Sequence, residues 1–150
     1  MAKAPSKAKS AEPTFSAEEK AAMREYAAEK KRAAKAGADA DGEAELLGKI
    51  AEMTGTDKTI AEKVHKLVRA AAPGLVPKTW YGMPAYANAA GKVVCFLQPA
   101  AKFKARYATL GFNDAAKLDD GNMWPTVYAI TKLTPAEEAR ISELVKTAAG

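Results

Sequence analysis

The sequence predicts an α+β fold, in which a mostly antiparallel sheet is flanked by helices and preceded by a helical N-terminal extension. Three features predict this class. Apolar residues recur at helical spacing before residue 73, short β-like runs separated by turn residues occupy residues 77–132, and helical spacing returns after residue 134. Helices that are followed by hairpin-like strands and then by a further helix are typical of α+β domains.

The first 42 residues are expected to lie outside the domain proper. Residues 1–14 have no large apolar side chain after the first residue and are predicted to form a disordered basic tail. Residues 15–36 are predicted to form a helical extension that Ser16 caps and that packs lightly near its start. Residues 37–42 are a linker by composition, which leaves residues 43–150 as one α+β domain.

Two amphipathic helices are predicted at the start of the domain, over about residues 43–53 and 57–72, with Thr56 placed to cap the second. Pro73 then ends the helical pattern. Their apolar faces consist of Leu46, Leu47, Ile50 and Met53 in the first helix, and of Ile60, Val64, Leu67, Val68 and Ala71 in the second.

Three large aromatic residues, a glycine and a proline are concentrated in residues 79–86 (Thr-Trp-Tyr-Gly-Met-Pro-Ala-Tyr). Gly82 permits unusual backbone angles and Pro84 removes a hydrogen-bond donor. We therefore expect a strand with a kink, on which aromatic side chains line a concave wall.

The remaining elements follow from alternation and turn chemistry. Strands are predicted at residues 92–97, 102–109 and 126–132. The first is expected to be a central strand, because every residue after Lys92 in it is apolar. In the second, Lys102, Lys104 and Arg106 would share one face. Turns are predicted at residues 88–91 and 120–121, a short helix or turn at 113–120, and a final helix with a capping box from Thr134.

The net charge of +5 lies mostly in the N-terminal extension, since residues 1–36 hold nine basic and five acidic residues. Residues 37–150 hold fourteen against thirteen, so nucleic-acid binding by the domain gains little support. A nucleic-acid accessory role through residues 1–36 stays an alternative. The single cysteine and the lack of an apolar run near about 20 residues predict a cytoplasmic protein with no membrane segment.

The block Trp80-Tyr81-Gly82-Met83-Pro84-Ala85-Tyr86 resembles the YdhG-like family, a bacterial family of unknown function. Gly91-Lys92 before an apolar strand and the Leu133-Thr134-Pro135 helix start fit the same family, and the resemblance covers about residues 46–145. It implies a small α+β domain with an antiparallel sheet. Because some members are described as frataxin-like iron chaperones, it also implies a non-enzymatic protein that binds iron transiently.

An iron site of the frataxin type would be a group of surface carboxylates, because ferrous iron accepts hard oxygen ligands. The best local cluster is Asp114, Asp119 and Asp120, and a second acidic run lies at residues 39–45. The alternative is that these are ordinary turn and helix-start acids.

Catalytic motifs are not evident in the sequence, and we expect a protein that is not an enzyme. The only histidine, His65, falls at the edge of a helical apolar face, where it is expected to make one hydrogen bond. Cys95 lies in an apolar strand and is expected to be a buried thiol with a raised pKa. Neither residue has a partner at catalytic or metal-ligand spacing.

A small-molecule binding module is the alternative to iron delivery. The aromatic block would form one side of a cleft that suits a planar or anionic ligand, with cationic donors at its rim. The competing interpretation is that the aromatics fill a small core. The candidate ligand-binding residues are Trp80, Tyr81, Gly82, Met83, Pro84, Tyr86, Lys92, Arg106, Tyr107 and Trp124.

Overall fold

The structure is a computed structural model that describes residues 14–36 and 41–150, so most of the predicted tail and linker lies outside the described residues. It contains helices and an antiparallel sheet, which confirms the α+β class. The elements are α1 (Ala17–Ala36), α2 (Gly42–Glu52), α3 (Gly55–Ala71), β1 (Val76–Trp80), β2 (Met83–Ala87), β3 (Val93–Gln98), the short 3-10 helix η2 (Ala101–Phe103), β4 (Ala108–Phe112), β5 (Val127–Ile130) and α4 (Pro135–Ala149).

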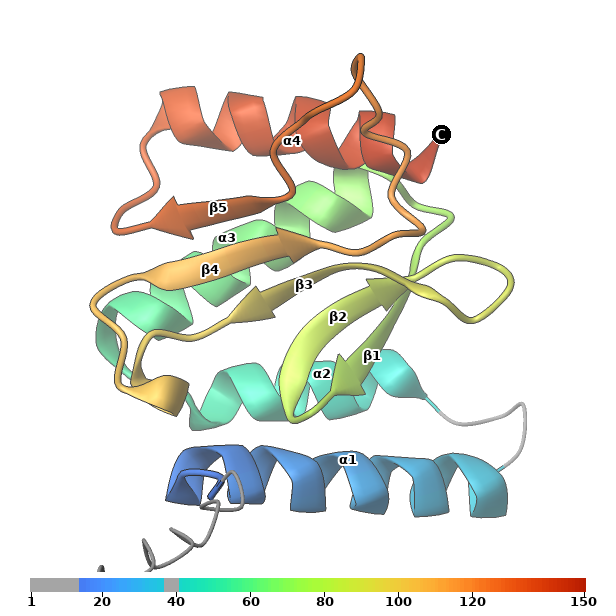
Figure 1. The fold of residues 1–150 in the computed structure, drawn as a ribbon, viewed down its shortest axis with the longest axis vertical. Coiled ribbons are helices and arrows are strands. Elements are labelled where there is room, and N and C mark those ends of the chain that lie inside the picture. The colour runs from blue at the N-terminus through green and yellow to red at the C-terminus, as the bar shows by residue number, and fades with distance from the viewer. Residues whose placement is uncertain (1–13, 37–40) are drawn as a thin grey trace, which may run out of the picture.

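The sheet is a meander in which the strands lie in chain order, and every neighbouring pair is antiparallel. Figure 1 shows α3 behind the sheet, α4 along the β5 edge at the top of the view, α2 beside β1 and β2, and α1 beyond α2 at the bottom. The core forms where α2, α3 and α4 cover one face of the sheet. Its largest fully buried side chains include Tyr86, Leu46, Leu97, Leu110 and Val64.

The predicted kinked strand is instead a tight hairpin, and this expectation was wrong. Trp80 pairs with Met83, so only Tyr81 and Gly82 connect β1 to β2. Both connecting residues have positive φ, 52° and 76°, which is the pattern of a type I′ turn. Glycine adopts such angles freely, whereas tyrosine needs support from its surroundings.

The predicted strand at residues 102–109 was wrong in its first half. Residues 101–103 form η2, and Lys104 has a left-handed φ of 53°. The reason is a tertiary contact, because the Asp57 carboxylate of α3 accepts hydrogen bonds from the N–H groups of Ala100 (2.8 Å) and Ala101 (3.0 Å). Consequently Lys102, Lys104 and Arg106 do not share a strand face.

Several local predictions were confirmed. Gly91 N–H bonds to the Asn88 carbonyl at 2.9 Å in the predicted turn, and β3 lies at the centre of the sheet. The capping box of the last helix is complete between Thr134 and Glu137. One cap was misplaced, since Thr54 rather than Thr56 precedes the second amphipathic helix.

Candidate functional site

The hairpin turn between β1 and β2 is held by α1. The Glu29 carboxylate accepts hydrogen bonds from the backbone N–H groups of Tyr81 (3.0 Å) and Gly82 (2.7 Å). Tyr26, one turn earlier on α1, stacks on the Tyr81 ring with centroids 4.2 Å apart and planes 12° from parallel. These contacts supply the support that Tyr81 needs at positive φ. They lie at the middle of α1, whereas the sequence predicted packing near the start of this helix.

A groove of about 520 Å³ runs between α1 and the β1 strand. Two aromatic side chains contribute to its walls, Tyr26 from α1 and Trp80 from β1. Three lysines also line it, Lys30 from α1, Lys78 from β1, and Lys92 from the turn before β3. The other lining residues are Glu29, Ala33, Gly42, Glu45, Val76, Pro77, Thr79, Gly91, Val93 and Asn113.

The two carboxylates in the groove are already engaged by other groups. Glu29 holds the hairpin amides, and Glu45 accepts from Arg32 Nε at 3.1 Å and from the Thr79 hydroxyl at 3.4 Å. By contrast, within residues 14–36 and 41–150 none of the three groove lysines has an acidic partner within 4.0 Å. Lys30 lies over the Tyr26 ring, 4.8 Å from its centroid. The groove therefore presents positive charge beside the side chains of Tyr26 and Trp80.

A second, more apolar cavity of about 320 Å³ lies on the other side of Trp80. The Trp80 ring is 5.1 Å from the Phe96 ring and 4.9 Å from the Tyr81 ring, so the three form one aromatic cluster. Phe96 in turn lies against Gly111, where an added Cβ would come within 2.3 Å of the Phe96 ring. Phe15, Glu19, Ala22, Met23, Met83, Gln98 and Phe103 complete the lining.

Tyr86 belongs to the opposite face of the sheet and does not line the groove. Its ring is fully buried in the core, and its hydroxyl lies 3.0 Å from His65 Nδ1. His65 Nε2 contacts Glu43 at 3.0 Å, and Glu43 also pairs with Arg69 at 3.3 Å. Burial raises the pKa of Tyr86 far above its usual range, so the phenol stays neutral. His65 thus makes two contacts rather than the single hydrogen bond that was expected.

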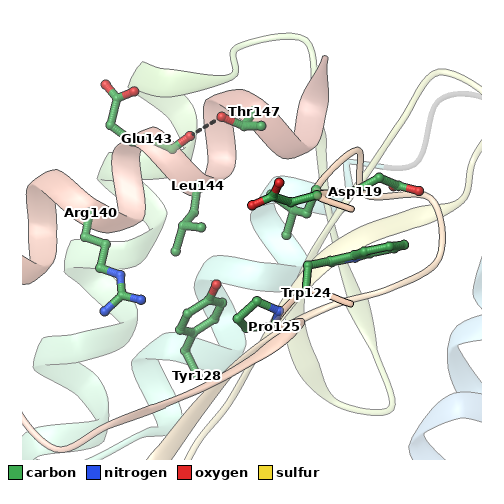
Figure 2. A pocket seen from close by; sticks show the side chains of 10 residues that line it. Asp119, Trp124, Pro125, Tyr128, Arg140, Glu143, Leu144 and Thr147 are labelled. Atoms are coloured by element: carbon green, nitrogen blue, oxygen red, sulfur yellow. Dashed lines mark hydrogen bonds between the residues drawn. The ribbon is translucent and has the colours of Figure 1, made fainter. Parts of the chain in front are cut away.

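The structure also separates Tyr107 and Trp124 from Trp80. Arg106 lies over the Tyr107 ring at 5.2 Å, after η2. Trp124 lines a different cavity of about 450 Å³, and Figure 2 shows it beside Asp119, Pro125 and Tyr128, below α4. The single cleft expected from the sequence is therefore divided among distinct places, and Pro84 is buried within β2.

Asp114, Asp119 and Asp120 are divided between two cavities. Asp119 and Asp120 line the cavity of Figure 2, and Asp114 lines a neighbouring one of about 510 Å³ together with Asp119. In the part of the chain that the structure describes, no three His, Cys, Asp or Glu side chains are grouped so as to hold a metal ion. Iron binding at these residues stays a prediction.

Cys95 is buried in β3, as the sequence predicted. Burial raises the pKa of its thiol to about 12, because the thiolate would lose its hydration.

Sequence reasoning missed the groove residues on α1, namely Tyr26, Glu29 and Lys30. A signal was present, because residues three and four apart lie on one helix face. That face of α1 carries Glu18, Ala22, Glu25, Tyr26 and Glu29 in succession. Three of these five residues are glutamates, so the face lacks the apolar periodicity that indicates a packed helix face.

The docking of α1 is expected to weaken in acid. Burial alone would raise the pKa of Glu25, but the hydrogen bond and positive charge of Lys102, together with Lys49, lower it below its usual 4.5. A folded-state pKa below the unfolded one stabilises the fold above the unfolded pKa, and this stabilisation is lost as the pH falls through the folded value. Urea unfolding of the wild type and of Glu25→Gln should therefore differ at pH 7, and the difference should shrink as the pH falls below 4.5. A difference that does not change with pH would contradict this assignment.

Comparison of this chain with protein-family models, with curated proteins and with solved structures finds no match. Among the described residues, no helix is long and apolar enough to cross a membrane.

Proposed function

We propose that this protein is a non-enzymatic binding protein that takes up a planar anionic small molecule in the groove between α1 and β1. The observation that carries the proposal is the juxtaposition of three lysines without acidic partners in the described chain and the aromatic side chains of Tyr26 and Trp80. The proposed binding site keeps Trp80 and Lys92 from the sequence prediction and adds Tyr26, Lys30 and Lys78.

The expected mode of binding follows from the chemistry of the lining. An aromatic ring of the ligand would stack on the Trp80 indole, since offset aromatic pairs are favourable beyond their burial. A carboxylate or phosphate group on that ring would accept charge-assisted hydrogen bonds from Lys78 and Lys92. Arg32, which pairs with Glu45, offsets the repulsion between that carboxylate and such an anion.

Fluorescence of a single tryptophan tests this proposal, because the chain has two tryptophans in different cavities. Trp124→Phe leaves Trp80 as the only indole, and its emission should change when nucleoside monophosphates or aromatic carboxylates are added. Trp80→Phe leaves Trp124, whose emission should stay constant.

Loss of one groove ammonium should weaken binding by about tenfold or more, since a charge-assisted hydrogen bond contributes about 1.5–3 kcal/mol. Lys78→Ala and Lys92→Ala are the informative variants, measured in the Trp124→Phe background. Lys146→Ala is the matched control, because it removes an exposed lysine from α4 instead.

Constant Trp80 emission across the panel would reject the proposal in favour of two competitors. Ferrous iron added anaerobically would then be expected to shift the NMR signals of Asp114, Asp119 and Asp120, the acidic cluster predicted from the sequence. Nucleic-acid binding through residues 1–36 would instead be steeply salt-dependent and indifferent to sequence.

A further inference from the structure

The tip of the β1–β2 hairpin has the chemistry of an oxyanion site. The N–H groups of Tyr81 and Gly82 are consecutive donors, and both are directed at one carboxylate, that of Glu29. Successive backbone N–H groups in a turn conformation form concave anion-binding sites. Two ammonium groups lie nearby, since Lys102 Nζ and Lys49 Nζ contact the Glu25 carboxylate at 2.8 Å and 3.5 Å.

The backbone amides of the hairpin tip and the ammonium group of Lys102 come close together at Gly82. A Cβ added to Gly82 would lie 1.5 Å from Glu25 Oε2 and 2.9 Å from Lys102 Nζ. A cavity of about 280 Å³ adjoins the same point and is lined by Glu25, Lys49, Gly82 and Lys102 among others. Gly82, Lys49 and Lys102 therefore border one cavity, and the Gly82 N–H is directed at Glu29.

At present α1 supplies the negative charge. Glu25 and Glu29 are four residues apart, so they project from the same face of the helix. Glu29 occupies the amides and Glu25 occupies the two ammonium groups. The helix thus places two carboxylates where a ligand with two negative charges would place its own.

Apart from the stacking of Tyr26 on Tyr81, the other contacts of α1 are largely exposed, so such a ligand would compete mainly with Glu25 and Glu29. Among the described side chains of α1 only Ala22 is buried, while Met23 on the same helix is 38% exposed. Further ion pairs join Glu18 to Lys104, whose side chain is 81% exposed, and Arg32 to Glu45. Exposed ion pairs contribute little to stability and are screened by salt.

We propose that the hairpin tip, with Lys49 and Lys102, binds a small doubly charged oxyanion, and that α1 occupies this site as an intramolecular competitor. The ligand is a phosphate group or a short dicarboxylate, and its binding releases α1 from the hairpin. The site differs from the groove of the proposed function, although release of α1 would also remove Tyr26 and Lys30 from the groove wall.

The test compares the full chain with a variant that lacks the competing carboxylates, Glu25→Ala/Glu29→Ala. The probes are inorganic phosphate and malonate, with chloride at equal ionic strength as the reference. The readout is the NMR shift of the Tyr81 and Gly82 amides, so the result does not depend on the Trp80 fluorescence that tests the groove. The double variant should bind one of the two probes at least about tenfold more tightly than the wild type, because two charged competitors are gone.

Two further variants test whether tighter probe binding comes from emptying the hairpin site. Glu18→Ala/Glu19→Ala removes the same charge from the same helix without vacating the hairpin, and it should leave the probe affinity within about threefold of the wild type. Lys102→Ala, added to the Glu25→Ala/Glu29→Ala variant, should lower the affinity again by about tenfold.

Each outcome decides the proposal. Tighter binding of phosphate alone identifies a phosphate site, and tighter binding of malonate alone identifies a dicarboxylate site. Equal probe affinity in the wild type and both double variants, or unchanged Tyr81 and Gly82 amide shifts in a folded Glu25→Ala/Glu29→Ala protein, would overturn it. If that variant does not fold, Glu29→Gln is used in its place, because it removes one charge and keeps the side-chain shape.

Discussion

Replacing Tyr86 by alanine is expected to lower the free energy of unfolding by about 3–5 kcal/mol, the range for truncating a large buried aromatic side chain. Tyr86 is fully buried between the sheet and α3, and its ring lies 5.9 Å from that of His65. A loss of this size is a large share of the roughly 5–15 kcal/mol that stabilises a small domain. Urea unfolding followed by circular dichroism measures it.

Tyr86→Phe separates the hydrogen bond from the packing. It keeps the ring but removes the hydroxyl that lies 3.0 Å from His65 Nδ1, so we expect a loss of about 1–2 kcal/mol. Met123→Ala is the control, because Met123 is 89% exposed and its truncation should change stability by less than about 0.5 kcal/mol. If Tyr86→Ala destabilises the protein no more than Met123→Ala, the placement of Tyr86 in the core is wrong.

Two glycines of α2 are expected to respond to alanine in opposite directions. A Cβ at Gly42 would lie 2.3 Å from the Pro77 carbonyl oxygen and 3.3 Å from the Lys78 Cα, both backbone atoms of β1. Relief would require α2 to move away from β1, so Gly42→Ala should cost about 1–3 kcal/mol of stability. Because Gly42 also lines the groove, the same variant should weaken ligand binding there.

Gly48 provides the matched control within the same helix. A Cβ at Gly48 meets nothing within 4 Å, so Gly48→Ala should stabilise the protein by about 0.5–1 kcal/mol through helix propensity alone. Thermal unfolding of both variants would show the opposite signs. Equal stabilisation by the two substitutions would mean that α2 does not approach β1 as closely as described.

Elements that depend on residues close together in the chain could be predicted from the sequence. The capping box of α4 joins Thr134 to Glu137, three residues away, and the turn at residues 88–91 closes through Asn88. The apolar faces of α2 and α3 follow from helical spacing, and the apolar run around Cys95 predicted the buried central strand. Interactions between residues so close in the chain depend little on the rest of the fold, so the sequence predicts them.

The arrangement of the aromatic block, residues 79–86, depends instead on contacts with residues far away in the chain. Tyr81 adopts a positive φ because Glu29, 52 residues earlier, accepts its N–H, and η2 replaces a strand because Asp57 holds the Ala100 amide from 43 residues away. Alternation predicted a strand at residues 102–109, but hydrogen bonds to a distant carboxylate outweigh that local preference. Charged faces such as that of α1 carry no apolar signal, so their partners become known only when the fold brings the opposite charges together.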